Sequence, residues 1–191
     1  MGADEFCDLS AADLRRLYAA RQLSPVEVAE GLLERIEVVD ATLNAFVTVS
    51  HDQALAQAEA AEKLFDGTAD PPPLAGIPFT LKDLTATDGI RTTRGSLLYK
   101  DWIPDYNAPL AQRMLDAGGV LLGKTNTPEL GWKGDSTNRV AGSTHNPWQH
   151  GRSPGGSSGG AAASVAVGLG AMAQGTDGAG SIRIPSGFCG T

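Results

Sequence analysis

The first third of the chain has the hydrophobic period of amphipathic helices. Behind Ser24, apolar residues recur every three or four positions and form one stripe, namely Val28, Leu32, Ile36 and Val39. Ser24 precedes Pro25 and Glu27, the arrangement of a capping box with proline at the first helical position. A helix is therefore predicted to begin at Pro25. Two further helices are expected, one opening at Ser10 and ending near Gln22, the other from Gln53 to Phe65.

The pattern changes after Asp70–Pro73, a stiff proline-rich linker. Ile77–Leu81 and Val120–Leu122 are short apolar runs, typical of buried strands, and a helix is expected between them from Pro109 to Ala117. A strand, a helix and a strand in this order predict a parallel βαβ unit. Two more elements are expected, a buried helix of small residues and then a strand, at 160–169 and 171–176.

Composition narrows the functional classes. The 191 residues carry a formal net charge of −7, which argues against direct binding of nucleic acid, since such a protein needs a face rich in lysine and arginine. The first six residues lack the basic and apolar regions of a secretory signal, and the apolar stretch 161–173 is too short to span a bilayer. Cys7 and Cys189 cannot form a multi-disulfide scaffold and have no metal-ligand spacing. A cytoplasmic protein is expected.

Glycine is concentrated near the end of the sequence, with 12 of the 24 glycines from Gly151 onward. The segment Ser153–Gly160 precedes an apolar helical run, so it predicts a tight turn that presents backbone N–H groups to an anion. It lacks the Gly-Lys-Ser/Thr ending of a nucleotide-binding P-loop. In Gly175–Pro185, successive N–H groups from Gly178 to Ser181 would lie beside the Ser181 hydroxyl, as in a nucleophile with its own oxyanion hole.

A nucleophilic serine needs a base. The three histidines, His51, His145 and His150, are expected to be structural or surface residues, because none lies in a segment built around it. Lys82 ends an apolar strand, where burial would lower its pKa enough for the amine to accept a proton. The alternative is an ordinary strand-end lysine whose amine reaches solvent. Asp83, the next residue, is expected to face the opposite side of the strand.

Five segments in this order resemble the amidase signature family of serine hydrolases: Gly76–Asp83, Gly123–Glu129, Asn146–Trp148, Pro154–Gly160 and Gly175–Arg183. The resemblance implies an α/β fold with a mixed central sheet covered by helices. It divides the chain into an N-terminal helical segment, 1–70, and the N-terminal half of the catalytic core, 71–191. Family members continue well beyond Thr191, so an incomplete sheet is expected, from a fragment or one piece of a cut protein.

The resemblance also implies a Ser–cis-Ser–Lys catalytic set. Lys82 would be the base, Ser157 the bridging serine after a cis peptide bond, and Ser181 the nucleophile. Ser181 follows Ser157 by 24 residues, as in the family, which favours Ser157 over Ser158 as the bridge. Further assignments are oxyanion donors at Gly178, Ala179, Gly180 and Ser181, an acyl pocket at Gly131 and Trp132, and a stiffening pair between Asp177 and Arg183. No metal or cofactor is implied.

The predicted function is hydrolysis of a small carboxamide or an aryl or acyl amide. The alternatives are the glutaminase subunit of a tRNA-dependent amidotransferase and a non-catalytic, glycine-rich anion-binding module. Ile184 before Pro185 favours a free-standing amidase, because the glutaminase subunit commonly has glutamine there. Expected partners are a small amide substrate and either a second copy of the chain or the C-terminal part of the same protein.

Overall fold

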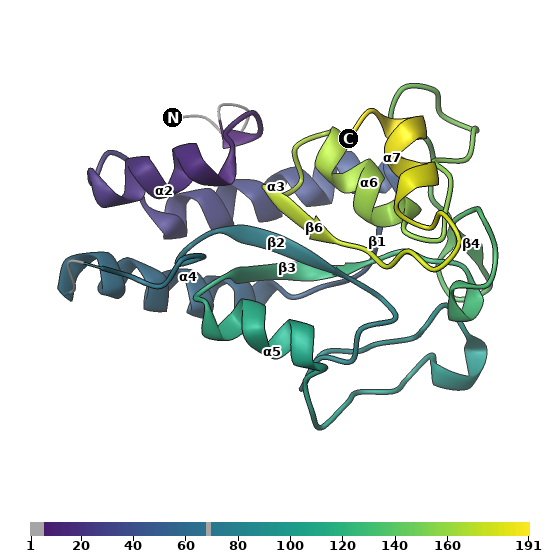
Figure 1. The fold of residues 1–191 in the computed structure, drawn as a ribbon, viewed down its shortest axis with the longest axis horizontal. Coiled ribbons are helices and arrows are strands. Elements are labelled where there is room, and N and C mark those ends of the chain that lie inside the picture. Colours follow the sequence, from purple (N-terminus) through teal and green to yellow (C-terminus); the bar gives the residue numbers. More distant parts are fainter. Residues whose placement is uncertain (1–5, 68–69) are drawn as a thin grey trace.

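The computed structural model describes residues 6–67 and 70–191, which form a four-stranded mixed sheet with helices on both sides (Figure 1). Residues 1–5, where the sequence predicts no secretory signal, lie outside the described residues. The expected α/β class is confirmed. The proposed division into 1–70 and 71–191 stays a prediction.

The N-terminal helices begin where their caps predict. Ser10 caps α2 (Ala11–Ala19), and Ser24 and Glu27 form the expected capping box of α3 (Pro25–Leu43). Helix α4 (His51–Gly67) begins two residues before the expected Gln53. Between α3 and α4 lies β1 (Phe46–Val49), a short strand that the sequence analysis did not predict.

The central sheet has the order β1-β3-β2-β6. Strand β2 (Pro78–Lys82) is parallel to both β3 (Val120–Thr125) and β6 (Met172–Gln174), and β1 is antiparallel to β3. Helix α5 (Pro109–Asp116) connects β2 to β3, so the predicted parallel βαβ unit is confirmed.

The pairing of β2 with β3 contains one irregularity. Phe79 pairs with Leu121 but Thr80 pairs with Gly123, so β3 has one extra residue, Leu122, at this point. Beyond it Leu81 pairs with Lys124, and Lys82 pairs with Thr125.

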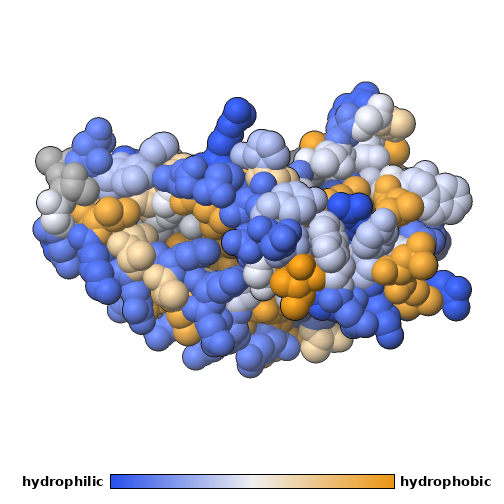
Figure 2. All heavy atoms as spheres, turned by 90° about the horizontal axis from the view of Figure 1, so that it is seen from below, coloured by the Kyte–Doolittle hydropathy of each residue, from blue (hydrophilic) through white to orange (hydrophobic). Residues whose placement is uncertain are grey.

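Two groups of buried apolar residues cover the two faces of the sheet. On the α5 face, Phe79, Leu81 and Leu121 pack with Ala111. The larger core lies on the other face and joins helices α2, α3 and α4 to the sheet. Seen from below, the outer surface is mainly hydrophilic, with separate hydrophobic groups between the polar residues (Figure 2). In the described part of the chain, no helix is long and apolar enough to cross a bilayer.

The remaining elements form the end of the molecule opposite α2 (Figure 1). They are two short 3₁₀ helices, η1 (Leu97–Tyr99) and η2 (Glu129–Gly131), the hairpin β4 (Thr137–Asn138) and β5 (Gly142–Ser143), α6 (Gly159–Ala166) and α7 (Arg183–Cys189). Helix α6 begins near the predicted position and ends three residues earlier than expected, and β6 is shorter than the predicted strand. Helix α7 was not predicted.

Candidate active site

Lys82, the last residue of β2, is fully buried. Its Nζ lies 2.6 Å from Ser157 Oγ, 2.9 Å from Ser158 Oγ and 3.0 Å from Thr176 Oγ1. The interpretation as a lysine that reaches solvent is therefore wrong. Burial lowers the pKa of Lys82 to about 8, although the negative charge of Asp177 acts in the opposite direction. About a tenth of the amine is therefore uncharged at pH 7, far more than for a lysine with the ordinary pKa.

The turn before α6 brings Ser157 to this amine. The peptide bond between Gly156 and Ser157 is cis, as the resemblance implies, and Gly155 has a positive φ of 83°. Ser157 and Ser158 are each 2% exposed. Both hydroxyls of the Ser-Ser pair thus face Lys82, which the spacing of motifs alone could not establish.

The two serines differ in what their hydroxyls can do. Ser158 Oγ donates to the Thr176 carbonyl oxygen at 3.3 Å and accepts from the Thr176 N–H at 3.2 Å. Its proton is therefore engaged, and it can only accept from Lys82. For Ser157, the described residues offer the hydroxyl one hydrogen-bond partner, Lys82 Nζ. Ser157 can accordingly pass a proton to the amine while Ser158 and Thr176 accept its two N–H bonds.

Ser181 lies on the turn between β6 and α7. Its carbonyl oxygen accepts a hydrogen bond from the Ser158 N–H at 3.0 Å, which ties this turn to the serine pair. Ser181 and Ser157 both line a cavity of about 400 Å³. Among the described residues, no hydrogen bond joins the Ser181 hydroxyl to Ser157, and contacts of this kind often tighten only when substrate binds.

Asp177 organises the turn that carries Ser181. Its carboxylate accepts hydrogen bonds from the backbone N–H groups of Gly180 (2.7 Å), Ile182 (3.2 Å) and Arg183 (3.2 Å). The Arg183 guanidinium completes the set with two contacts of 2.9 Å, and the predicted pair is confirmed. The Arg183 side chain holds the pKa of Asp177 well below its usual range, with help from these N–H groups.

This arrangement changes the expected set of oxyanion donors. The Gly180 N–H points to Asp177, so Gly180 is removed from that set. Within residues 6–67 and 70–191, the N–H groups of Gly178, Ala179 and Ser181 have no acceptor, and all three residues line the cavity. These three N–H groups remain candidates for holding a developing negative charge.

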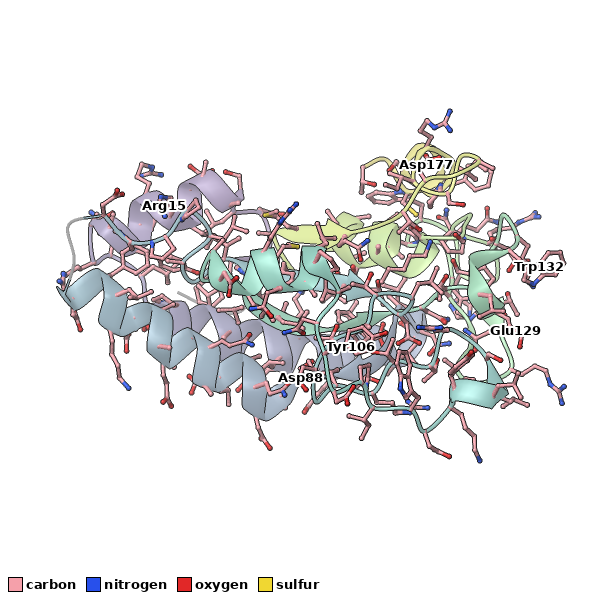
Figure 3. The ribbon with its side chains drawn as sticks, turned by 60° about the horizontal axis from the view of Figure 1, so that its bottom comes forward. Arg15, Asp88, Tyr106, Glu129, Trp132 and Asp177 are labelled. Atoms are coloured by element: carbon pink, nitrogen blue, oxygen red, sulfur yellow. The ribbon has the colours of Figure 1, made fainter. Side chains whose placement is uncertain are left out.

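The rest of the cavity wall combines apolar side chains with two polar ones, Lys133 and Thr176. Gly131 and Trp132, predicted from the resemblance, both line it, together with residues that the sequence analysis did not assign, Leu84, Leu130 and Ile184. Trp132 is 74% exposed and lies at the same end of the molecule as Asp177 (Figure 3). None of the three histidines, all of which lie in the described residues, lines the cavity.

Three comparisons with known proteins agree with this arrangement. A family model described as Amidase matches residues 27–191. The chain is 47% identical over 182 residues to an acylamidase of Rhodococcus erythropolis, and 42% identical over 182 residues to a subunit of the glutamyl-tRNA(Gln) amidotransferase of Carboxydothermus hydrogenoformans. Each match covers 95% of this chain and 38% of the relative, so the chain spans well under half the length of these relatives.

A solved structure gives the same result. The fold matches that of a bacterial aryl acylamidase belonging to the amidase signature enzymes, with a TM-score of 0.88 and 39% identity. The match covers 93% of this chain and 37% of the other. The fold of the described residues therefore matches a part of this solved enzyme.

Proposed function

Because the chain belongs to the amidase family, we propose that it supplies the catalytic side chains of an amidohydrolase that cleaves a carboxamide C–N bond through an acyl-enzyme on Ser181. The observation that carries the proposal is the 2.6 Å hydrogen bond between the buried Lys82 amine and the Ser157 hydroxyl. A lysine with a pKa of about 8 is uncharged often enough to act as a base.

Acylation begins with neutral Lys82. Its lone pair takes the Ser157 proton, Ser157 takes the proton of Ser181, and Ser181 Oγ attacks the amide carbon. The carbonyl oxygen becomes an oxyanion, for which the N–H groups of Gly178, Ala179 and Ser181 are the proposed donors. Such a donor is typically worth about 3 kcal/mol in the transition state.

The same groups return the proton. The Lys82 ammonium passes it through Ser157 to the leaving nitrogen, the C–N bond breaks, and ammonia or an amine departs. Water then attacks the acyl-enzyme by the reverse route and regenerates Ser181 with release of a carboxylic acid. This sequence balances without a metal or a cofactor.

The cavity wall indicates the substrate class. Leu84, Leu130, Trp132 and Ile184 present mainly apolar surface beside Ser181, which suits an aryl or aliphatic acyl group. The acylamidase of Rhodococcus erythropolis supports the same class by name. We propose Gly131 and Trp132 as acyl-binding residues. A cytoplasmic location and a partner, either a second copy or a C-terminal part, also remain proposals.

A glutaminase role is the second candidate, because subunits of glutamyl-tRNA(Gln) amidotransferases are among the relatives. Such a protein would release ammonia from glutamine for a partner. Ammonia release from glutamine and from simple aryl amides, with and without tRNA, separates the two functions.

The direct test is labelling with a fluorophosphonate, which reacts with activated serines. In the full natural polypeptide that contains these residues, mass spectrometry is expected to place the label on Ser181, and Ser181→Ala is expected to abolish it. Failure of the unsubstituted protein to react would contradict the hydrolase function and favour the anion-binding module.

A further inference from the structure

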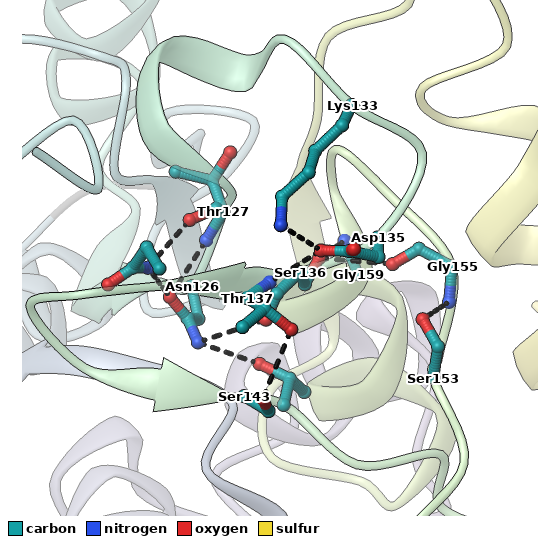
Figure 4. Close-up of polar contacts among 12 residues, drawn as sticks. Asn126, Thr127, Lys133, Asp135, Ser136, Thr137, Ser143, Ser153, Gly155 and Gly159 are labelled. Atoms are coloured by element: carbon teal, nitrogen blue, oxygen red, sulfur yellow. Dashed lines mark hydrogen bonds and ion pairs between the residues drawn. The ribbon is translucent and has the colours of Figure 1, made fainter.

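The position of Ser157 depends on the turn formed by residues 155–159, and the Ser136 side chain is hydrogen-bonded to both ends of this turn. Ser136 Oγ donates a hydrogen bond to the Gly155 carbonyl oxygen at 3.0 Å and accepts one from the Gly159 N–H at 2.9 Å. A single hydroxyl thus joins the two ends of the turn that carries Ser157 (Figure 4). Ser136 is 1% exposed and does not line the cavity beside Ser181.

The backbone around Ser136 packs closely against the same turn. A Cβ atom added at Gly156 would lie 2.0 Å from the Asp135 carbonyl oxygen, and one added at Gly159 would lie 2.3 Å from Ser136 Oγ. Real Cβ atoms do not approach so closely, so only glycine fits at these two positions. Asp135 and Ser136 therefore form the surface on which the turn is shaped.

Ser136 is itself anchored to the end of β3. Its carbonyl oxygen accepts from the Thr144 N–H at 3.0 Å and from Asn126 Nδ2 at 3.5 Å. Asn126 is fully buried, and its own carbonyl oxygen accepts from the Gly160 N–H at 3.2 Å. The sheet, Ser136 and the start of α6 are therefore joined by hydrogen bonds on both sides of the turn.

From these contacts we propose that Ser136 is a positioning residue, which fixes the Ser157 hydroxyl relative to Lys82 and Ser181 through its two hydrogen bonds to the turn. The inference rests on the proposed function. Because Ser136 lies outside the cavity wall, its loss changes the rate of the proton transfer and not the affinity for a ligand.

The test measures fluorophosphonate labelling of Ser181 in the full natural polypeptide, resolved into the maximal rate kinact and the half-saturating concentration KI. Ser136→Ala is expected to lower kinact by about 10²-fold, the effect of a displacement near 1 Å, with KI unchanged. Ser136→Cys keeps the shape of the side chain with a slightly larger, weakly hydrogen-bonding sulfur, so an intermediate rate is expected. The pH midpoint of kinact should rise, because a loosened turn admits water to Lys82 and weakens the effect of burial on its pKa.

Ser164→Ala is the matched control. Ser164 is fully buried in α6, and its hydroxyl donates to the Ala161 carbonyl oxygen at 2.9 Å, outside the turn formed by residues 155–159. Its removal also costs a buried hydrogen bond, so the melting temperature should fall while kinact and the pH midpoint stay unchanged.

Two results would overturn this inference and leave the proposed function standing. In the first, Ser136→Ala and Ser136→Cys are labelled at the same rate as Ser164→Ala. In the second, the Ser136 variants are labelled more slowly only because KI rises, with kinact unchanged. In both cases Ser181 remains reactive, and the proposed function stands. Absence of labelling in the unsubstituted protein overturns the proposed function and this inference together.

Discussion

Lys82 and Lys124 lie on neighbouring strands and differ in what surrounds their amines. Both are fully buried, and burial lowers the pKa of each to about 8. The Lys82 amine contacts three hydroxyl groups, and two of the residues that carry them, Ser157 and Thr176, line the cavity beside Ser181. Lys124 donates to the Thr85 carbonyl oxygen and to the hydroxyls of Thr87 (3.0 Å) and Thr92 (2.9 Å), and the negative charge of Asp83 opposes the effect of burial on its pKa.

The comparison shows that a lowered pKa does not make a lysine a base. Both Thr92 and Thr87 donate their hydroxyl protons to backbone carbonyls, at 3.0 and 3.1 Å, so neither has a proton to give to Lys124. Ser157 keeps its proton available and lines the cavity. We infer that Lys124 balances the charge of Asp83 and holds the residues after β2, while Lys82 acts on substrate.

The largest expected effect comes from replacing each lysine with methionine. Lys82→Met should lower fluorophosphonate labelling of Ser181 by about 10²–10⁴-fold, because it removes the general base. Lys124→Met should leave labelling nearly unchanged but lower the free energy of unfolding by about 3 kcal/mol, because the buried acceptors of Lys124 lose their donor and buried Asp83 loses one of its neighbouring positive charges. Labelling kinetics and urea denaturation measure the two effects. A reversed pattern would assign the base to Lys124.

Alanine substitutions of Ser157 and Ser158 test whether a hydroxyl near Lys82 must have a free proton to donate. Ser157→Ala should lower labelling by about 10²-fold or more, since it removes the hydroxyl that is proposed to relay the proton. Ser158→Ala should cost about tenfold, the value of one hydrogen bond that orients Lys82. Labelling rates of the two variants under identical conditions check this order. Equal losses in both would argue that the serines only orient the amine.

The pH dependence tests the charge around Lys82. Only the neutral amine accepts a proton, so labelling should rise with pH and level off above a midpoint near 8. The charge of Asp177 raises the pKa of Lys82, so Asp177→Asn should move this midpoint down, while the loosened turn lowers the plateau. Labelling rates measured across about pH 6–10 give both values. A midpoint that moves up would show that Asp177 acts mainly through burial of the site.

The smallest expected effects come from replacing one threonine beside each lysine amine, Thr176 beside Lys82 and Thr92 beside Lys124. Thr176→Val removes one acceptor from Lys82 and should slow labelling about fivefold, the equivalent of one neutral hydrogen bond. Thr92→Val should leave labelling unchanged and lower the free energy of unfolding by about 1 kcal/mol, because two hydrogen bonds are lost on the Lys124 side. Labelling rates and melting temperatures of Thr176→Val and Thr92→Val distinguish the effect on catalysis from the effect on stability.

The sequence predicted those features that depend on local pattern. The cap at Ser24 placed α3, and the apolar run ending at Lys82 placed a buried amine. Strand β1 was missed although its residues, Phe46–Val49, are all of types enriched in strands, because the run is only four residues long and its pairing with β3 is not visible in the local pattern. Helix α7 escaped because it contains Pro185 and Gly187, and the proline is tolerated in the first turn.

The residues of the candidate site also fall into two groups, those that a local sequence pattern predicts and those that depend on the folded chain. The motifs identified Ser157 and Ser181, but the contact of Thr176 with Lys82 depends on β6 lying beside β2, which no local pattern specifies. Likewise, the partners of Ser136 lie 19 and 23 residues further along the chain. The capture of the Gly180 N–H by Asp177 is a property of the folded turn, and it changed the expected oxyanion donors.

The extra residue in β3 determines the side of the sheet to which the Lys124 side chain points. Side chains that pair across two parallel strands project to the same side, so an unbroken register would set Lys124 directly alongside Lys82. With Leu122 inserted, Lys124 pairs instead with Leu81 and turns to the α5 side. If β3 kept all its residues and paired without this irregularity, two like charges would share a single buried space, so the bulge at Leu122 keeps the working amine electrostatically apart from its neighbour.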